Sequence, residues 1–369
     1  MFPPSSEPND NSPQTAAHSP PLHPPPDTAP VDDMFTRHNA QLFYQQSLLL
    51  DSNLVQIYHD AIFSNVEDFD GMTVLDVGTG PGISAIFLAQ AGAKKVYGVE
   101  MSAMATHAKK LVNRNNFQEN VEILRGKVEE VELPEMVDVV FSVPFSVLLV
   151  HERMLEAFVV ARDRWLKPGG KVFPDNSTVF AAPFTDVALH DEVVGMSAFW
   201  GNESYIGIDI SSLAFESTAE NFGRPVVGSF HPDVLLCEDR ASKTFDLNTV
   251  TLDELRNFEI SFEHVMTMTA FCHGIACWFD GEFVGTAETV RIETGPEARE
   301  TRWSQCRLLF CEPIAVNRGQ ILLGRVKFTA NNYFSYDVQI TAAIKGSIPK
   351  VVRTNTARLQ DLHYRCMFP

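Results

Sequence analysis

A strand, a glycine-rich turn, a helix and a second strand follow one another in the segment Thr73–Glu100, which reads TVLDVGTGPGISAIFLAQAGAKKVYGVE. Gly78, Gly80 and Gly82 come directly after a short apolar run, so backbone N–H groups and a helix N-terminus can approach a ligand without a side chain in the way. Glu100 ends the second strand about 20 residues later. In βαβ nucleotide sites an acidic residue at this position accepts hydrogen bonds from the ribose hydroxyls. The segment therefore predicts a nucleoside-binding βαβ unit.

The spacing of the glycines distinguishes two kinds of ligand. A dinucleotide fingerprint needs G-x-G-x-x-G, and its third glycine position is Ile83 here. The observed pattern, D-x-G-x-G-x-G with Asp76 at its head, suits S-adenosylmethionine, which has a ribose but no pyrophosphate. We therefore expect an S-adenosylmethionine site. The alternative is a plain tight turn between strand and helix that binds nothing.

Alternating strands and helices continue as far as Pro174. The expected elements are helices over Gln41–Phe63, Ala103–Asn115 and Glu152–Trp165, and strands over Val121–Arg125, Val137–Val143 and from Lys171. The nearly continuous apolar run Val137–Val143 is typical of a central parallel strand. The pattern predicts the α/β class, with a Rossmann-like parallel sheet, crossover helices and N-terminal helices over residues 34–174, which the resemblance given below identifies as a methyltransferase domain.

After Pro174 the sequence no longer alternates between strand and helix patterns. Short β-branched and aromatic runs, separated by Gly, Pro, Asp and Asn, predict an antiparallel β-barrel domain over residues 175–369. A helical excursion at about residues 196–221 interrupts this pattern and carries Phe199, Trp200 and a turn from Gly207 to Asp209. Exposed aromatic side chains on an excursion usually need a partner. The alternative is that Phe199 and Trp200 belong to the core.

The charge balance favours basic partners over nucleic acid. The chain has 29 Lys+Arg against 47 Asp+Glu and a net charge of −18, which repels phosphate backbones and attracts arginine- or lysine-rich peptides. All six cysteines lie beyond Leu236 without a C-x-x-C pair, so we expect free thiols and no bound metal. The longest apolar run, Val137–Val150, is too short to cross a bilayer. We expect a cytoplasmic protein that does not bind membranes.

Proline dominates the first part of the chain. Residues 1–33 mix prolines with Ser, Asn and Asp, which predicts a disordered tail with local polyproline character. Two roles stay open for this tail: a solvated leader, or a ligand for SH3- or WW-like partners.

The order of an S-adenosylmethionine-type sheet, a β-barrel and a helical arm resembles the type I protein arginine methyltransferases, nearest to the coactivator-associated branch. The resemblance runs from about Gln45 to Tyr336. Its most specific motifs are Val74–Gly82, Gly126–Pro134 (GKVEEVELP), Glu152–Glu156 (ERMLE), Ala182–Asp186 (APFTD) and Cys277–Asp280 (CWFD).

The resemblance also implies roles for single residues. Asp76, Gly78 and Gly80 would form the cofactor loop. Glu100 would hold the ribose, and Val128 with Glu129 would hold the adenine. The arm residues would dock onto the methyltransferase domain of a partner subunit; they are Phe199, Trp200, Gly207 and Asp209.

The family's chemistry, by the same resemblance, uses two glutamates on one hairpin loop. They clamp a guanidinium and draw its positive charge away from the attacking nitrogen. The first acid position is Val143 in this chain, and the second is retained as Glu152. Losing one preorganised charge partner costs on the order of 3 kcal/mol, or ~10²–10³ in rate. The Met and Tyr positions of the same loop are Phe145 and Val147.

Three further positions of the pocket depart from the family pattern. The arginine that grips the cofactor's carboxylate is replaced by Leu54, three residues after Asp51. The histidine of the threonine-histidine-tryptophan loop is replaced by Arg302, which can still form an ion pair with Asp51 and so hold the loop in place, but without acid/base use. The aromatic motif of the cofactor lid is reduced to Phe35–Asn39.

These departures predict a catalytically inactive chain. It would be a prozyme that pairs with a catalytic type I paralogue in a heterodimer or heterotetramer, and that stabilises and activates the paralogue to make asymmetric dimethylarginine. Because Leu54 removes the carboxylate partner, we expect weak S-adenosylmethionine binding or none. Two alternatives stay open: a weakly active or re-targeted methyltransferase that uses Glu152, and a scaffold that holds arginine/glycine-rich proteins.

Overall fold

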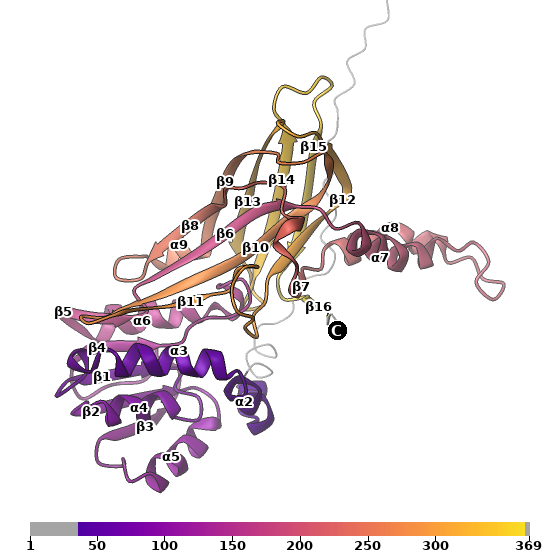
Figure 1. Ribbon diagram of the computed structural model, residues 1–369. Helices are drawn as coiled ribbons and strands as arrows, with labels where there is room; N and C mark the ends of the chain where they lie inside the picture. Colours follow the sequence, from indigo (N-terminus) through magenta and orange to yellow (C-terminus); the bar gives the residue numbers. More distant parts are fainter. Residues whose placement is uncertain (1–35, 366–369) are drawn as a thin grey trace, which may run out of the picture.

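The computed structural model describes residues 36–365, and the predicted proline-rich tail lies outside the described residues. An α/β domain and a β-rich domain lie end to end, and a helical arm projects from the β-rich domain (Figure 1). This arrangement confirms the predicted fold class, a Rossmann-like methyltransferase domain followed by an antiparallel β domain.

A five-stranded parallel sheet forms the centre of the α/β domain, in the order β3-β2-β1-β4-β5. Its strands are β1 (Thr73–Val77), β2 (Lys95–Glu100), β3 (Val121–Arg125), β4 (Val137–Ser142) and β5 (Leu166–Phe173). All five residues of β1 are buried, because the strand is apolar and lies in the middle of the sheet. The strand order reverses between β1 and β4, and this kind of switch point leaves a crevice at the carboxyl ends of the strands.

The helices of this domain include α2 (Leu42–Leu49), α3 (Ser52–Phe63), α4 (Ile83–Gln90), α5 (Met104–Arg114) and α6 (Met154–Trp165). Three of them, α4, α5 and α6, pack on the strands of this sheet, and α2 and α3 precede it in the chain. The carboxylate of Asp51 caps α3 by accepting a hydrogen bond from the backbone N–H of Leu54 at 3.0 Å. The cap fixes the point at which the N-terminal helices reach the carboxyl edge of the sheet.

The second domain contains a seven-stranded sheet and a four-stranded sheet, whose strands pair antiparallel except for the parallel pair of β7 and β16. The strands are β6 (Asn176–Phe184), β7 (Val226–Val227), β8 (Ala241–Asp246), β9 (Asn257–Val265), β10 (Ala270–Val284), β11 (Thr289–Glu293), β12 (Cys306–Val316), β13 (Ile321–Ala330), β14 (Tyr336–Ile344), β15 (Val352–Arg358) and β16 (His363–Tyr364). Burial alternates strictly along β9, so one face of the strand packs into the core. In that core Phe258 of β9 stacks on Phe328 of β13, with ring centroids 4.4 Å apart.

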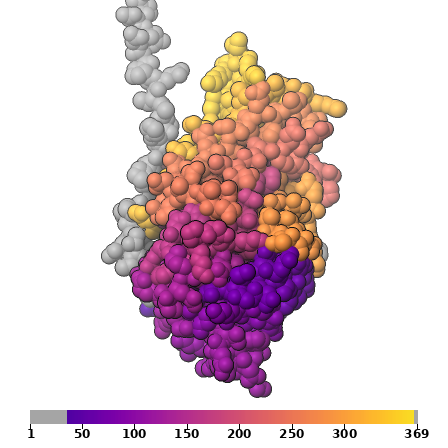
Figure 2. Space-filling view, turned by 90° about the vertical axis from the view of Figure 1, so that its left-hand side faces the viewer, coloured from indigo at the N-terminus to yellow at the C-terminus, as the bar shows by residue number. Residues whose placement is uncertain are grey.

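Asn65 links the two domains. Its side-chain nitrogen donates to the carbonyl oxygen of Glu288 at 3.0 Å, and its oxygen accepts from the backbone N–H groups of Ala287 and Glu288. A Cβ at Gly285 would lie 1.9 Å from Cγ of Asn65, so the β10–β11 turn can reach this side chain only with glycine there. Figure 2 shows the indigo surface of the N-terminal helices against the orange surface of the β-rich domain.

The helical arm is longer than predicted. It contains α7 (Val187–Ala198), the 3-10 turns η3 (Phe199–Gly201) and η4 (Ser211–Leu213), and α8 (Ala214–Phe222). Asp186 caps α7 and also pairs with the buried Arg307 at 2.7 Å, which anchors the arm on β12. Phe199 and Trp200 are 48% and 37% exposed, so they do not belong to the core.

Five of the six cysteines lie in the described part of the chain, and these five are free thiols. Burial raises the pKa of Cys272 and of Cys306 to about 12, so these thiols stay protonated and unreactive at neutral pH. Among residues 36–365 no helix has the length and apolar character that crossing a membrane requires.

Candidate active site

A cavity of about 790 Å³ opens at the carboxyl ends of β1, β2 and β4, within the size range of small-molecule sites. Its walls come from α2, α3, the glycine loop, the segment after β4 and a loop of the β-rich domain. The predicted site residues that line it are Leu54, Gly78, Gly80, Glu100, Val128, Glu129, Val143, Phe145, Val147, Glu152 and Arg302. His38 and Asn39 of the predicted lid motif also line it, whereas Phe35 lies outside the described residues.

The glycine loop forms one wall of this cavity. Gly80 has a φ of +54°, and a Cβ on it would lie 3.1 Å from Oε1 of Gln45 on α2. A side chain here would be strained and would also push against α2. The backbone therefore lies bare toward the cavity, which is the arrangement that the sequence predicted for a nucleoside ligand.

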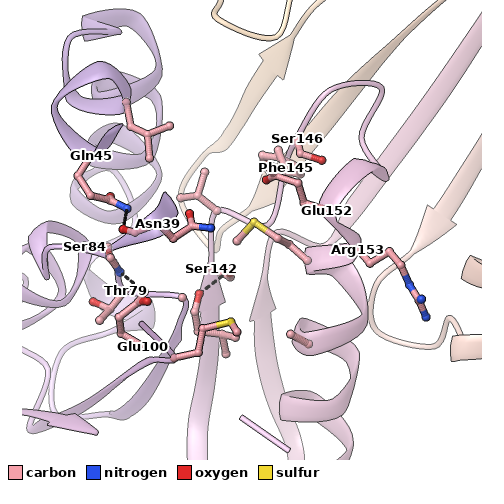
Figure 3. A pocket seen from close by; sticks show the side chains of 18 of the residues that line it. Asn39, Gln45, Thr79, Ser84, Glu100, Ser142, Phe145, Ser146, Glu152 and Arg153 are labelled. Atoms are coloured by element: carbon pink, nitrogen blue, oxygen red, sulfur yellow. Dashed lines mark hydrogen bonds between the residues drawn. The ribbon is translucent and has the colours of Figure 1, made fainter. Parts of the chain in front are cut away.

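Glu100 lies at the same end of the cavity as the glycine loop (Figure 3). Its carboxylate is buried and accepts hydrogen bonds from the backbone N–H groups of Gly80, at 3.1 Å, and Ser102, at 2.8 Å. These two donors fix the carboxylate but leave acceptor capacity on both oxygens, which two ribose hydroxyls can use. The residue therefore fits its predicted role toward a nucleoside.

Asp76 supports the loop from behind and does not line the cavity, contrary to its predicted place in the cofactor site. It is buried in β1 and accepts a hydrogen bond from the hydroxyl of Ser84 at 2.6 Å. Burial raises the pKa of Asp76 to about 6. Its hydrogen bond with Ser84 joins the start of α4 to β1.

Val128 and Glu129 occupy the predicted adenine position. Val128 is buried and Glu129 is exposed. Their carbonyl oxygens accept hydrogen bonds from Nη1 of Arg164, at 3.3 and 2.5 Å, which fixes the backbone of this turn. An apolar surface beside ordered backbone groups suits a flat heterocycle.

Glu152 lies on a strained loop at the other end of the cavity. It has a φ of +68° and Arg153 a φ of +54°, so α6 begins at Met154 and the predicted helix start at Glu152 is wrong. Leu148 and Leu149 also have positive φ. Non-glycine residues keep such angles only where surrounding contacts hold them, and such strain clusters at functional sites. Figure 3 shows Glu152 beside Phe145 and Ser146.

The β-rich domain holds this loop in place. Nδ1 of His151 lies 2.8 Å from the hydroxyl of Ser335, and Arg153 donates to the carbonyl of Asn331 at 3.2 Å. Burial raises the pKa of Glu152 to about 7, an effect that the positive charge of Arg302 opposes. The carboxyl group is therefore poised between its two protonation states at neutral pH.

An ion cluster around Glu156, which the sequence did not predict, holds the Glu152 loop in place. Glu156 accepts two hydrogen bonds from Arg153, at 2.6 and 2.8 Å, and two from Arg256, at 2.9 and 2.8 Å. Glu156 is buried, and Arg256 comes from the β-rich domain, 100 residues further along the chain. The cluster therefore fixes α6 and the Glu152 loop against the second domain.

Arg302 does not form the predicted ion pair with Asp51. Its backbone N–H, rather than its guanidinium, donates to the Asp51 carboxylate at 3.0 Å. The guanidinium carbon instead lies 5.6 Å from the centre of the Tyr44 ring. The loop that carries Arg302 is therefore held to Asp51 through its main chain. The guanidinium of Arg302 lines the cavity.

The remaining substituted positions make one wall of the cavity apolar. Leu54 is 5% exposed, and Val143 is partly buried next to the core. Phe145 packs against Trp303 and Phe279, with ring centroids 6.1 and 5.7 Å away. No motif in the sequence pointed to three further lining residues, Tyr44, Gln45 and Tyr364, because only the fold brings their segments to the cavity.

Two family descriptions match the chain. Residues 74–170 match a methyltransferase domain, and residues 175–347 match an arginine methyltransferase oligomerization subdomain. A rice protein named "Probable histone-arginine methyltransferase CARM1" is 38% identical over 344 residues, which are 91% of this chain and 65% of the relative. "Histone-arginine methyltransferase CARMER" of Drosophila ananassae is 40% identical over 88% of this chain and 60% of the relative. The chain thus spans less than two thirds of these relatives.

Two solved structures match almost over their whole length. Protein arginine methyltransferase 10 of Arabidopsis thaliana has a TM-score of 0.79 and 31% identity, over 87% of this chain and 99% of its own. A chain of the Trypanosoma brucei PRMT1 enzyme-prozyme heterotetrameric complex with AdoHcy has a TM-score of 0.78 and 30% identity over the same shares.

Proposed function

Because the chain belongs to the protein arginine methyltransferase family, we propose that it is an S-adenosylmethionine-dependent protein arginine methyltransferase that relies on Glu152. The observation that carries this proposal is the position of Glu152. A carboxyl group with a pKa of about 7 lies on a strained, anchored loop in the same cavity as the glycine loop and Glu100.

The prediction of a catalytically inactive chain is contradicted by the curated relatives, which are named as histone-arginine methyltransferases at 38 to 40% identity. The prediction counted the positions at which the pocket departs from the family pattern. It weighed Glu152 and Arg302 from the sequence alone, whereas in the structure both side chains line the cavity.

The prediction of weak or absent S-adenosylmethionine binding also finds no support. The fold is that of the methyltransferase domain, and the similar T. brucei assembly is a complex with AdoHcy. In this chain the bare loop at Gly80, the fixed carboxylate of Glu100 and the ordered turn at Val128 fit a nucleoside. When bound, the cofactor supplies a methyl group activated by a sulfonium.

Glu152 would act on the substrate guanidinium, which is protonated at any working pH. In its ionised form it accepts hydrogen bonds from the substrate N–H groups and draws positive charge toward itself, so that the opposite nitrogen becomes a better nucleophile. The net charge of −18 favours arginine-rich peptides as substrates. The apolar side chain of Val143, where the family has a second acid, leaves Glu152 as the main partner of that charge.

A second candidate role is that of a partner subunit for a type I paralogue. The exposed Phe199 and Trp200 on the arm favour it, together with the match of residues 175–347 to an oligomerization subdomain. In this prozyme-like role the chain would stabilise a paralogue in a heterodimer or heterotetramer and raise its output of asymmetric dimethylarginine. Mixing purified subunits and measuring the paralogue's activity tests it; no change in any paralogue would contradict it.

Methyl transfer by the isolated chain tests the main proposal. Radiolabelled S-adenosylmethionine and an arginine/glycine-rich peptide should give labelled peptide with the wild-type chain. Glu152→Gln should lower the rate by ~10²–10³, because it removes the charge that stabilises the transition state. Glu130→Gln is a matched control, since Glu130 is exposed and does not line the cavity. No transfer by the wild-type chain, or equal loss in both variants, would contradict the proposal.

A further inference from the structure

The cavity has basic side chains that an anionic ligand group could use, but most of them are already engaged. Arg153 and Arg256 both bind the buried carboxylate of Glu156. His151 is uncharged at neutral pH, because burial lowers its pKa to about 4, and its ring bonds Ser335. Lys127 belongs to the turn at the predicted adenine position and has partners of its own.

Arg302 is different. Its Nη1 atom is buried and has no hydrogen-bond partner among residues 36–365, although the side chain lines the cavity. A buried guanidinium nitrogen without a partner is costly, so such a group usually has one when the protein is at work. The Tyr44 ring, 5.6 Å from the guanidinium carbon, holds the group in position without using its N–H donors.

Asp51 fixes the main chain of residue 302 beside the start of α3. One oxygen of its carboxylate accepts the backbone N–H of Leu54 and the other accepts the backbone N–H of Arg302, each at 3.0 Å. Positions 54 and 302 are therefore neighbours on one wall of the cavity. The α3 side of this wall is apolar because of Leu54, so its positive charge comes from the loop of the β-rich domain.

We propose that Arg302 binds the carboxylate of the amino-acid end of S-adenosylmethionine. Glu100 and the glycine loop would hold the nucleoside end, and Arg302 and Glu152, which line the same cavity, would face the amino-acid end. A guanidinium has five N–H donors in a planar fork, which matches a carboxylate and leaves donors for Glu152. This assignment rests on the proposed function, because it takes S-adenosylmethionine as the ligand.

Calorimetry with two ligands tests the assignment. S-adenosylmethionine and decarboxylated S-adenosylmethionine differ in the carboxylate alone. Arg302→Ala should weaken the binding of S-adenosylmethionine by about 10- to 100-fold, the factor that a hydrogen-bonded charge pair carries. It should change the binding of the decarboxylated ligand by less than about threefold, and that ligand also reports whether the variant's pocket is folded. Arg302→Lys should recover part of the affinity, because it keeps the charge.

Arg299→Ala provides the matched control, since Arg299 is exposed on the same loop and does not line the cavity. It should leave both dissociation constants unchanged. Equal losses for both ligands in Arg302→Ala, or no loss for S-adenosylmethionine, would overturn the assignment. The result is independent of turnover. A chain that shows the expected binding pattern but transfers no methyl group would contradict the proposed function and leave this assignment standing.

Discussion

The backbone N–H of Arg302 donates a hydrogen bond to Oδ2 of Asp51 at 3.0 Å, although 251 positions separate the two residues in the sequence. Asp51 also caps α3, so one carboxylate joins the N-terminal helices to a loop of the β-rich domain. The cavity lies between these two parts. The place of residue 302 on the cavity wall therefore depends on this side chain.

Replacing Asp51 by alanine should destabilise the protein and weaken cofactor binding together. Loss of a helix cap costs about 0.5–2 kcal/mol, and a buried loop contact adds about 1 kcal/mol. Urea unfolding and calorimetry with S-adenosylmethionine measure the two effects. Asp51→Asn keeps one acceptor oxygen and should lose less on both counts. A variant that loses stability but binds the cofactor as well as wild type would contradict the link between cap and cavity.

Glu152 should reduce the stability of the folded chain at neutral and alkaline pH. Burial raises its pKa from 4.5 to about 7. The folded state therefore holds the proton more tightly than the unfolded state, and the free energy of unfolding falls as the pH rises from 4.5 through 7. Glu152→Gln removes this effect and should be more stable than wild type by about 1–3 kcal/mol at pH 8. At pH 4 the two should unfold alike, and an equal difference at both values would contradict the assignment.

The rate of methyl transfer should follow the ionisation of the same group. The ionised carboxylate is the form that binds and polarises a guanidinium, so kcat/KM should rise about tenfold per pH unit below pH 7 and level off above it. Steady-state rates with the peptide well below its KM, at constant ionic strength, measure this profile. A rate that does not change between pH 6 and pH 8 would show that Glu152 is not the group that limits the reaction.

The sequence predicted the parts of this site that depend on local spacing. The glycine loop and Glu100 lie within one βαβ unit, and the family resemblance placed Glu152 on the loop between β4 and α6. The Glu156–Arg256 pair could not be predicted, because it joins side chains from two domains that only the fold brings together. The start of α6 was misplaced because Glu152 and Arg153 have positive φ, which tertiary contacts impose against their helix propensity.

The error about Arg302 has a different origin. An arginine near Asp51 suggested an ion pair, because charge complementarity is what a sequence displays. The main chain of residue 302 takes that carboxylate instead, and the side chain extends over Tyr44. A buried acceptor can be bonded by a backbone N–H or by a side-chain donor, and the sequence alone does not show which of the two donates the hydrogen bond.

Restoring the missing acid should increase turnover. Val143 lines the cavity with Glu152, and its side chain is partly buried. Val143→Glu adds a second carboxylate for the substrate guanidinium and should raise kcat at least tenfold, part of the ~10²–10³ that one preorganised charge partner contributes. Val143→Gln is the control of equal size, and it should give no such gain. If both variants lose activity to the same extent, the apolar wall is itself required and the interpretation of this position is wrong.

The arm should determine whether the chain assembles. Phe199 packs against Trp200 and Tyr205, with ring centroids 5.5 and 5.3 Å away, and this aromatic group lies at the far end of α7 from the barrel. Side chains of this size on an exposed arm gain free energy only when a second subunit covers them. In sedimentation experiments at micromolar concentration the wild-type chain should therefore associate, and Phe199→Glu should sediment as a monomer. It should also lower methyl transfer if the assembled state is the active one.

Ile348→Glu is the matched control for that change, because Ile348 is 97% exposed but lies on the loop between β14 and β15, away from the arm. It places the same charge on an exposed apolar position and should leave the sedimentation coefficient unchanged. A Phe199→Glu variant that sediments like wild type would contradict the arm as the assembly surface. Phe199 does not line the cavity, so a loss of activity in that variant would reflect assembly and not damage to the site.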